Sequence, residues 1–200
     1  MEQNHLANVF VSCSLREEDK PFIDLVTNIL IHYNFNPFGT VGLYDASTDN
    51  PVALMKKNID KCDFVVVAAT KRYQTKDTHN EDKESNSLSE MIHNETGMAY
   101  MKSKPIVVFV EEGTNVGGFI RNITQYITLD KSQENLDSQT NLILSLLNDA
   151  LQKVQAKRRS TAWKDLGSLL LKGLAAYGGL KLLNESDEDC DEDLDDNEEV

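Results

Sequence analysis

The stretch Phe64-Val65-Val66-Val67-Ala68-Ala69 is an uninterrupted apolar run with the length of a β-strand. Such a run is typical of a strand that is buried on both faces, as in a parallel sheet. Two other apolar runs, Val9 to Ser12 and Ile106 to Val110, have a similar length. We therefore expect them to form further strands of the same buried sheet.

Three segments with helical periodicity separate these runs. One follows Pro21, a favourable first helical residue, and the others span Pro51 to Asp60 and Leu88 to Lys102. The stretch at residues 34–38 is expected to end the first helix and start a second extended piece, and a final short strand is expected at residues 126–129. Because strands and helices alternate, the sequence predicts an α/β fold, a flavodoxin-like parallel sheet covered by helices on both faces in three layers.

Two stretches of the chain lack periodicity. Residues 39–50 are rich in Gly, Asp and Ser and are loop-like, and the charged residues 73–86 are expected to form a long mobile loop. Ligands of parallel α/β sheets bind at the carboxyl ends of the strands, so a site is expected in the loops that follow them. The strands in question end at Ser12, Phe38, Ala69 and Val110.

The pattern changes after the α/β domain, which is expected to span residues 1–132. Residues 133–184 form a C-terminal helical extension with two apolar stripes, which Lys157-Arg158-Arg159-Ser160 is expected to separate. Glycines weaken the second helix, so packing on the domain or pairing in an oligomer is favoured over an interfacial membrane helix at residues 157–183. The acidic composition of residues 185–200 predicts a disordered, solubilising tail. The alternative is a regulatory or partner-binding tail.

The composition excludes several classes of function. The formal net charge is −13, but 11 of the 33 acidic residues lie in the tail, and the rest of the chain is nearly neutral. Without a basic stripe, nucleic acid is not expected as a partner. The three cysteines form no CxxC pair or Cys/His cluster, so neither a metal nor a cofactor is expected. Free thiols, the lack of a signal peptide and the lack of a spanning apolar run of about 18 residues predict a cytoplasmic protein.

One carboxylate stands out in the third helical segment. Glu95 lies within Ser89-Glu90-Met91-Ile92-His93-Asn94-Glu95-Thr96-Gly97-Met98-Ala99-Tyr100, shortly before the strand that begins at Ile106. No packing role explains an acid at this position, whereas near the strand ends it could face a nucleotide. The alternative is an ordinary solvated glutamate on a helix.

Further candidate residues follow the first two strands. Ser12, Ser14 and Arg16 could hold ribose hydroxyls or a pyrophosphate, or they could belong to an ordinary helix-capping loop. Phe38 could stack on a base, although core packing is the safer interpretation. Asp45 could accept a hydrogen bond from a ribose hydroxyl, with a turn aspartate as the favoured alternative.

Several segments, taken in order, resemble a TIR domain of the prokaryotic TIR and TIR-like branch related to nucleoside 2-deoxyribosyltransferases. They are Val9-Phe10-Val11-Ser12, Lys61-Cys62-Asp63-Phe64-Val65-Val66-Val67, and Glu95 with Ala99 and Lys104-Pro105-Ile106. The resemblance covers roughly residues 7–130 and implies cleavage of the nicotinamide–ribose bond of NAD, with Glu95 as the catalytic residue. NAD would then be a substrate. Enzymatic members often carry Trp or Cys shortly before this glutamate, where this sequence has Met91 and Ile92.

Three hypotheses follow. The first is an NAD nucleosidase, either a hydrolase or an ADP-ribose cyclase, that acts in antiphage defence or immune signalling. It would be switched on by self-association into a homo-oligomer and would act with a partner defence protein. The second is a non-catalytic TIR adaptor or nucleotide-sensing module, and the third is a nucleoside deoxyribosyltransferase-like enzyme. A single glutamate suffices for the first, because nicotinamide departs neutral and one carboxylate can stabilise or trap the ribosyl cation.

Overall fold

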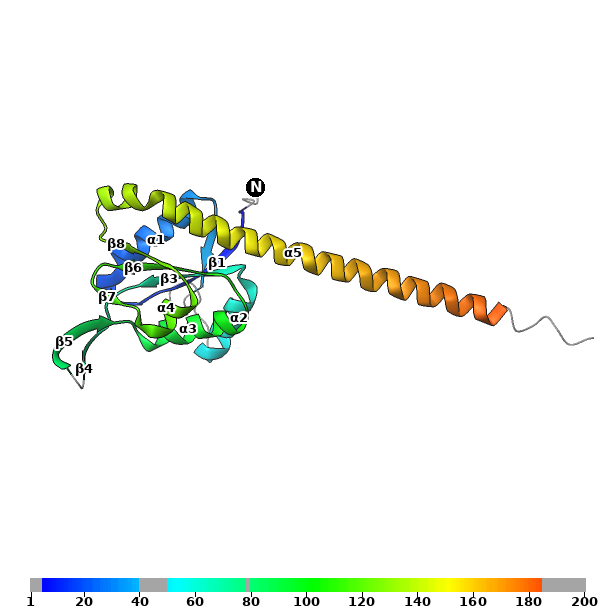
Figure 1. The fold of residues 1–200 in the computed structure, drawn as a ribbon, viewed down its shortest axis with the longest axis horizontal. Helices are drawn as coiled ribbons and strands as arrows, with labels where there is room; N and C mark the ends of the chain where they lie inside the picture. Colours follow the sequence, from blue (N-terminus) through cyan, green and yellow to red (C-terminus); the bar gives the residue numbers. More distant parts are fainter. Residues whose placement is uncertain (1–4, 40–49, 78–79, 185–200) are drawn as a thin grey trace, which may run out of the picture. The chain divides into compact units, whose positions relative to one another are not determined.

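A computed structural model describes residues 5–39, 50–77 and 80–184 of the chain. The chain divides into two compact units, residues 1–155 and 156–200, and each is described by itself. The first unit contains a five-stranded parallel sheet (Figure 1). Its strands are β1 (Asn8–Ser12), β2 (Asn36–Phe38), β3 (Phe64–Ala69), β6 (Ile106–Glu111) and β8 (Tyr126–Leu129).

The strand order in this sheet is β2-β1-β3-β6-β8. The chain therefore moves outward from β1 to β2 and then returns to place β3 on the other side of β1. This is the flavodoxin-like order, and it confirms the α/β class expected from the sequence. The reversal of direction opens a crevice between the carboxyl ends of β1 and β3, where ligands of such sheets bind.

Helices cover both faces of the sheet, as expected for three layers (Figure 1). One face is covered by α1 and by the first part of α5, and the other by α2, α3 and α4. Their bounds are α1 (Lys20–His32), preceded by the 3₁₀ turn η1 (Glu17–Asp19), α2 (Pro51–Lys61), α3 (Glu90–Met101), α4 (Gly117–Ile123) and α5 (Gln133–Asn184).

Local sequence signals explain where these helices begin and end. The side chains of Asn50 and Ser89 cap α2 and α3 by accepting hydrogen bonds from the amides of Val52 and Ile92. After α1, Asn34 adopts a positive φ of 60°, a conformation that asparagine tolerates better than most residues. That residue ends the helix and directs the chain into β2.

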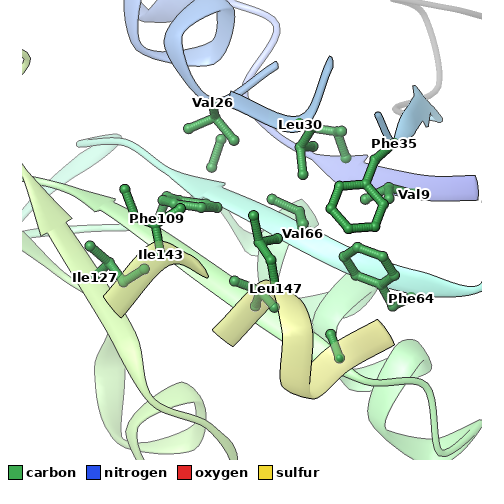
Figure 2. Close-up of a cluster of buried hydrophobic side chains, with 14 of the residues drawn as sticks. Val9, Val26, Leu30, Phe35, Phe64, Val66, Phe109, Ile127, Ile143 and Leu147 are labelled. Carbon is green, nitrogen blue, oxygen red and sulfur yellow. The ribbon is translucent and has the colours of Figure 1, made fainter. Parts of the chain in front are cut away.

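A cluster of buried hydrophobic side chains fills the α1 side of the sheet. Figure 2 shows residues of α1 and α5 meeting side chains of the sheet from opposite ends of this cluster. The cluster includes Val26 and Leu30 of α1, Ile143 and Leu147 of α5, and Val66 and Phe109 of the sheet. The first part of α5, up to Gln155, therefore belongs to the same compact unit as the sheet.

The expected mobile loop at residues 73–86 is wrong. The chain forms an antiparallel hairpin of β4 (Tyr73–Asp77) and β5 (Asn80–Ser87), and β7 (Thr114–Asn115) adds a parallel strand to it. The hairpin is too polar to show the alternation that marks a half-buried strand. Backbone hydrogen bonds between β4 and β5 stabilise the hairpin instead. Side-chain hydrogen bonds add to them, such as that from Thr75 Oγ1 to the Ser85 carbonyl (3.0 Å).

The expected break at residues 157–160 is also wrong, because α5 continues through them. Lysine and arginine are good helix formers, so charge alone does not end a helix. The Ser160 hydroxyl donates to the Lys157 carbonyl over 2.9 Å and stays within the helical pattern. Among the described helices, none is long and apolar enough to span a bilayer.

Candidate functional site

Glu95 is buried between α3 and the sheet. It is 1% exposed, and α3 turns it toward the sheet together with Ile92, Thr96 and Ala99. These residues share one face of the helix because their spacing matches its period. Glu95 is therefore not a solvated surface glutamate, and its carboxyl group needs a polar partner.

That partner is the hydroxyl of Ser12, which donates a hydrogen bond to Glu95 Oε2. Side chains alternate along β1, so Val9 and Val11 face the α1 side whereas Phe10 and Ser12 face the α3 side. Ser12 is the last residue of β1 and is fully buried. The pleat of the strand and the period of the helix thus bring the two polar side chains together.

Burial raises the pKa of the Glu95 carboxyl from 4.5 to about 7, and the hydrogen bond from Ser12 opposes this rise. Among the described side chains, no lysine, arginine or histidine forms an ion pair with Glu95. The protonated and ionised forms are therefore both populated near neutral pH. A buried acid with such a pKa that opens into a cavity is a candidate functional group.

Glu95 lines a cavity of about 460 Å³, a volume typical of small-molecule sites. The lining comes from the loop after β1, the start of the hairpin after β3, and the first turns of α3. The residues are Cys13, Ser14, Leu15, Arg16, Arg72, Tyr73, Ser89, Glu90, Met91, Asn94 and Glu95. The cavity thus lies at the crevice that the strand order opens between β1 and β3.

Arg16 connects the two loops at this crevice. Its guanidinium makes a two-pronged contact with Asp19, with Nε–Oδ2 at 2.9 Å and Nη2–Oδ1 at 3.1 Å, and Nη1 lies 3.1 Å from Glu18 Oε1. Nη2 also donates to the carbonyl of Lys71, in the loop after β3. The hydrogen bond to Asp19 is the main cause that raises the pKa of Arg16. Asp19 precedes α1, but its side chain binds Arg16 and does not cap the helix.

The structure brings together four of the residues singled out from the sequence, namely Ser12, Ser14, Arg16 and Glu95. Ser14 Oγ accepts a hydrogen bond from the backbone amide of Arg16 over 3.3 Å and lines the cavity.

Two candidates from the sequence are not part of this group. Phe38 pairs with Phe10 across neighbouring strands, so both rings point to the same face and pack edge to face, 6.4 Å between centroids. Phe38 packs against the core and does not line the cavity. Asp45 lies outside the described residues.

Among the lining residues that the sequence does not single out as candidates, Arg72 and Tyr73 carry groups suited to contact a ligand. Arg72 and Tyr73 follow β3, and the Arg72 guanidinium lies over the Tyr73 ring, 5.8 Å from its centroid. The expectation of a mobile loop concealed them, although their place after a buried strand is where such a sheet positions ligand-binding residues. Among the described residues, no group of three or more His, Cys, Asp or Glu side chains is arranged to hold a metal ion.

Comparison with curated proteins gives no match. Among solved structures, the chain is similar to the CMP N-glycosidase BcmB of Clostridium botulinum, with 20% identity and a TM-score of 0.43. The similarity covers 66% of this chain and 98% of that one. At this score the likeness does not establish a shared activity. The model of a family described as a domain of unknown function, DUF4062, matches residues 8–166. Since that span is most of the chain, the protein belongs to the DUF4062 family.

Proposed function

We propose that the protein cleaves the N-glycosidic bond of a nucleoside or nucleotide, and that Glu95 acts at the reacting sugar carbon. The observation that carries this proposal is the buried Glu95 carboxyl group, which accepts a hydrogen bond from Ser12 and lines a cavity at the crevice of the sheet. A buried acid without a basic partner destabilises a fold, so its presence beside a cavity has a functional explanation.

The chemistry needs one carboxylate near the anomeric carbon. The C1′–N bond breaks, its electron pair leaves with the base, and the sugar becomes an oxocarbenium-like cation. The ionised Glu95 stabilises this cation or forms a bond to C1′. Water then adds its hydroxyl to C1′; where a Glu95–C1′ bond has formed, that bond breaks and its electron pair returns to the carboxylate. The proton that water releases neutralises the departed base. Because the carboxylate is shielded from bulk water, its attraction to the cation is strong.

The neighbours of Glu95 have separate roles in this proposal. Ser12 orients the carboxylate and favours its ionised form, since its hydroxyl donates the hydrogen bond. The Ser14 hydroxyl is available to a ribose hydroxyl in the same cavity. Tyr73 lines the cavity and is 47% exposed, which suits it to contact a base. Arg16 holds the two loops together, because Asp19, Glu18 and the Lys71 carbonyl already occupy its guanidinium.

NAD is the particular substrate that the TIR resemblance implies. One observation favours it as a second candidate. Among the described lining residues Glu95 is the one buried acid, so no second buried acid is present to protonate a leaving base. Nicotinamide needs no such proton because it leaves as a neutral molecule. Activation by self-association and a partner defence protein stay predictions that accompany this candidate. A deoxyribosyltransferase-like enzyme would break the same bond but pass the sugar to a second base.

The test is base release by the full-length protein. The substrates are the common ribonucleosides and deoxyribonucleosides, their 5′-monophosphates and NAD, with and without a second free base as acceptor. We expect release from at least one substrate, and Glu95→Gln should lower its rate by about 10³-fold or more. Glu112→Gln is the matched control, because Glu112 is exposed and outside the cavity.

The outcomes separate the hypotheses. Equal rates for the wild type and Glu95→Gln would contradict the role of Glu95. Exchange of the base without net hydrolysis would favour the transferase. Nucleotide binding without turnover of any substrate would contradict the proposed activity and favour a sensing module.

A further inference from the structure

Four charged side chains line the cavity, and they differ in whether an oppositely charged side chain pairs with them. Glu95 is buried, and Glu90 is exposed in the first turn of α3. The other two are Arg16 and Arg72, at the ends of the two loops that form the crevice. Because two carboxylic acids line the cavity, an anion can enter only where a cation outweighs them.

Arg16 is not that cation. Its donors are directed at Asp19, Glu18 and the Lys71 carbonyl, so its charge is used inside the protein. Arg72 differs, because no carboxylate among the described residues forms an ion pair with it. The Arg72 guanidinium carbon lies 5.8 Å from the centroid of the Tyr73 ring, and a contact with an aromatic ring does not neutralise the positive charge.

The backbone around Arg72 is fixed on both sides of the crevice. Its amide donates to the Ser87 carbonyl over 2.8 Å, and the preceding carbonyl, that of Lys71, accepts from Arg16. The loop after β3 is therefore tied to β5 and to the loop after β1. Arg72 therefore extends from an anchored backbone at the edge of the cavity, where its side chain is exposed and open to a ligand.

We propose that Arg72 binds the phosphate of the substrate and makes the cavity selective for nucleotides over nucleosides. This proposal rests on the proposed function, which identifies the ligand as a nucleoside or nucleotide. A planar guanidinium pairs with two phosphate oxygens at once, which gives both affinity and orientation. The phosphate at Arg72 and the sugar carbon at Glu95 then fix the two ends of the sugar. Arg16 is a positioning residue for Arg72.

The test is a comparison of ligand affinities that requires no turnover. The Glu95→Gln protein is used because its expected turnover is too slow to consume the ligand during a titration. Isothermal titration measures its affinity for each common ribonucleoside and its 5′-monophosphate. We expect the best monophosphate to bind about 10- to 100-fold more tightly than its nucleoside, the size expected for a hydrogen bond with a charged partner. Adding Arg72→Gln should bring this ratio close to one while the nucleoside affinity stays the same. Arg72→Lys should retain part of the ratio.

The matched control is Lys76→Gln, which removes one positive charge from the same hairpin outside the cavity and should keep the ratio. Inorganic phosphate tests whether any anion suffices. Phosphate that binds as tightly as the nucleotide would overturn the proposal. Three other results would also overturn the proposal. They are an affinity ratio near one while Arg72 is still present, an equal loss of affinity for nucleoside and monophosphate in Arg72→Gln, and no binding of either ligand. Failure of base release with the ratio intact would count against the proposed function alone.

Discussion

The two faces of the sheet are covered in the same way, but their buried side chains differ in kind. On one face α1 buries Phe22, Ile23, Val26 and Leu30, all of them apolar. On the other face α3 buries Ile92 and Ala99 but also Glu95 and Thr96. The first face follows the simple rule that a helix buries its apolar stripe. The second departs from that rule at the position where a cavity opens, which locates the candidate site.

The largest expected effect on stability comes from the apolar face. Phe22 is fully buried in its cluster, so Phe22→Ala should lower the free energy of unfolding by about 3–5 kcal/mol. Urea denaturation measures the change. Ile31→Ala on the exposed side of the same helix should change stability by less than about 0.5 kcal/mol. Similar losses for both variants would show that this face is not the rigid core described here.

Glu95→Gln tests whether the buried acid on the second face destabilises the fold. This substitution should stabilise the protein at high pH, where Glu95 is ionised. The unfolded chain ionises near pH 4.5, whereas the folded protein keeps the Glu95 proton until about pH 7. The stability that the raised pKa contributes to the wild-type protein is therefore fully present below pH 4.5. It is lost as the pH rises through about 7, which lowers the free energy of unfolding by about 3 kcal/mol in total. Urea denaturation should show Glu95→Gln to be more stable by about this amount at pH 8 and nearly unchanged at pH 4. An equal difference at both pH values would contradict the assigned pKa.

Ser12→Ala should raise the pKa of Glu95 further, because it removes the hydrogen bond that lowers it. It should also lower stability at pH 8 by about 1–2 kcal/mol. NMR titration of the Glu95 side-chain carbon measures the pKa. Ser14→Ala is the control, since Ser14 lines the cavity but is not the hydroxyl that donates a hydrogen bond to Glu95, and it should leave that pKa unchanged. A lower pKa in Ser12→Ala would contradict the direction of this hydrogen bond.

The smallest effect compares two helix caps. Ser89 caps α3, which carries Glu95, and Asn50 caps α2, which does not line the cavity. Replacing either by alanine should cost about 1 kcal/mol, seen in thermal denaturation. Base release should decline only in Ser89→Ala, because only that change loosens the helix under the carboxylate. Equal activity in the two variants would show that α3 tolerates this loosening.

The fold could be predicted where buried apolar runs mark its elements. Phe64 to Ala69 reads as a central strand because all six side chains are buried, and α1 reads as a helix because Phe22, Val26 and Leu30 repeat with its period. The hairpin could not be predicted, because backbone pairing rather than side-chain burial holds β4 to β5. The continuity of α5 through Arg158 and Arg159 could not be predicted from the apolar pattern, because a run of exposed charged residues interrupts the apolar stripe without ending the helix.

The candidate site could be predicted only in part. Glu95 attracted notice as an acid in a helix near strand ends, and Ser12 as the last residue of β1. Their hydrogen bond spans 83 residues of sequence and depends on how the helix and the strand face each other, which no local pattern reveals. Arg72 and Tyr73 line the cavity at the start of the hairpin. Because the sequence does not reveal the hairpin, it does not place these two residues at the site either.

The most direct test of the central claim, that an ionised buried glutamate acts on the sugar, is the pH dependence of base release. It is measured as kcat/KM from pH 4.5 to 9 on the best substrate of the full-length protein. We predict that the rate rises with pH through a midpoint of about 7 and then stays level, because the carboxylate is the active form. In Glu95→Gln the residual rate should be independent of pH over this range. A rate that falls as the pH rises through 7, or a midpoint that survives in Glu95→Gln, would contradict the claim.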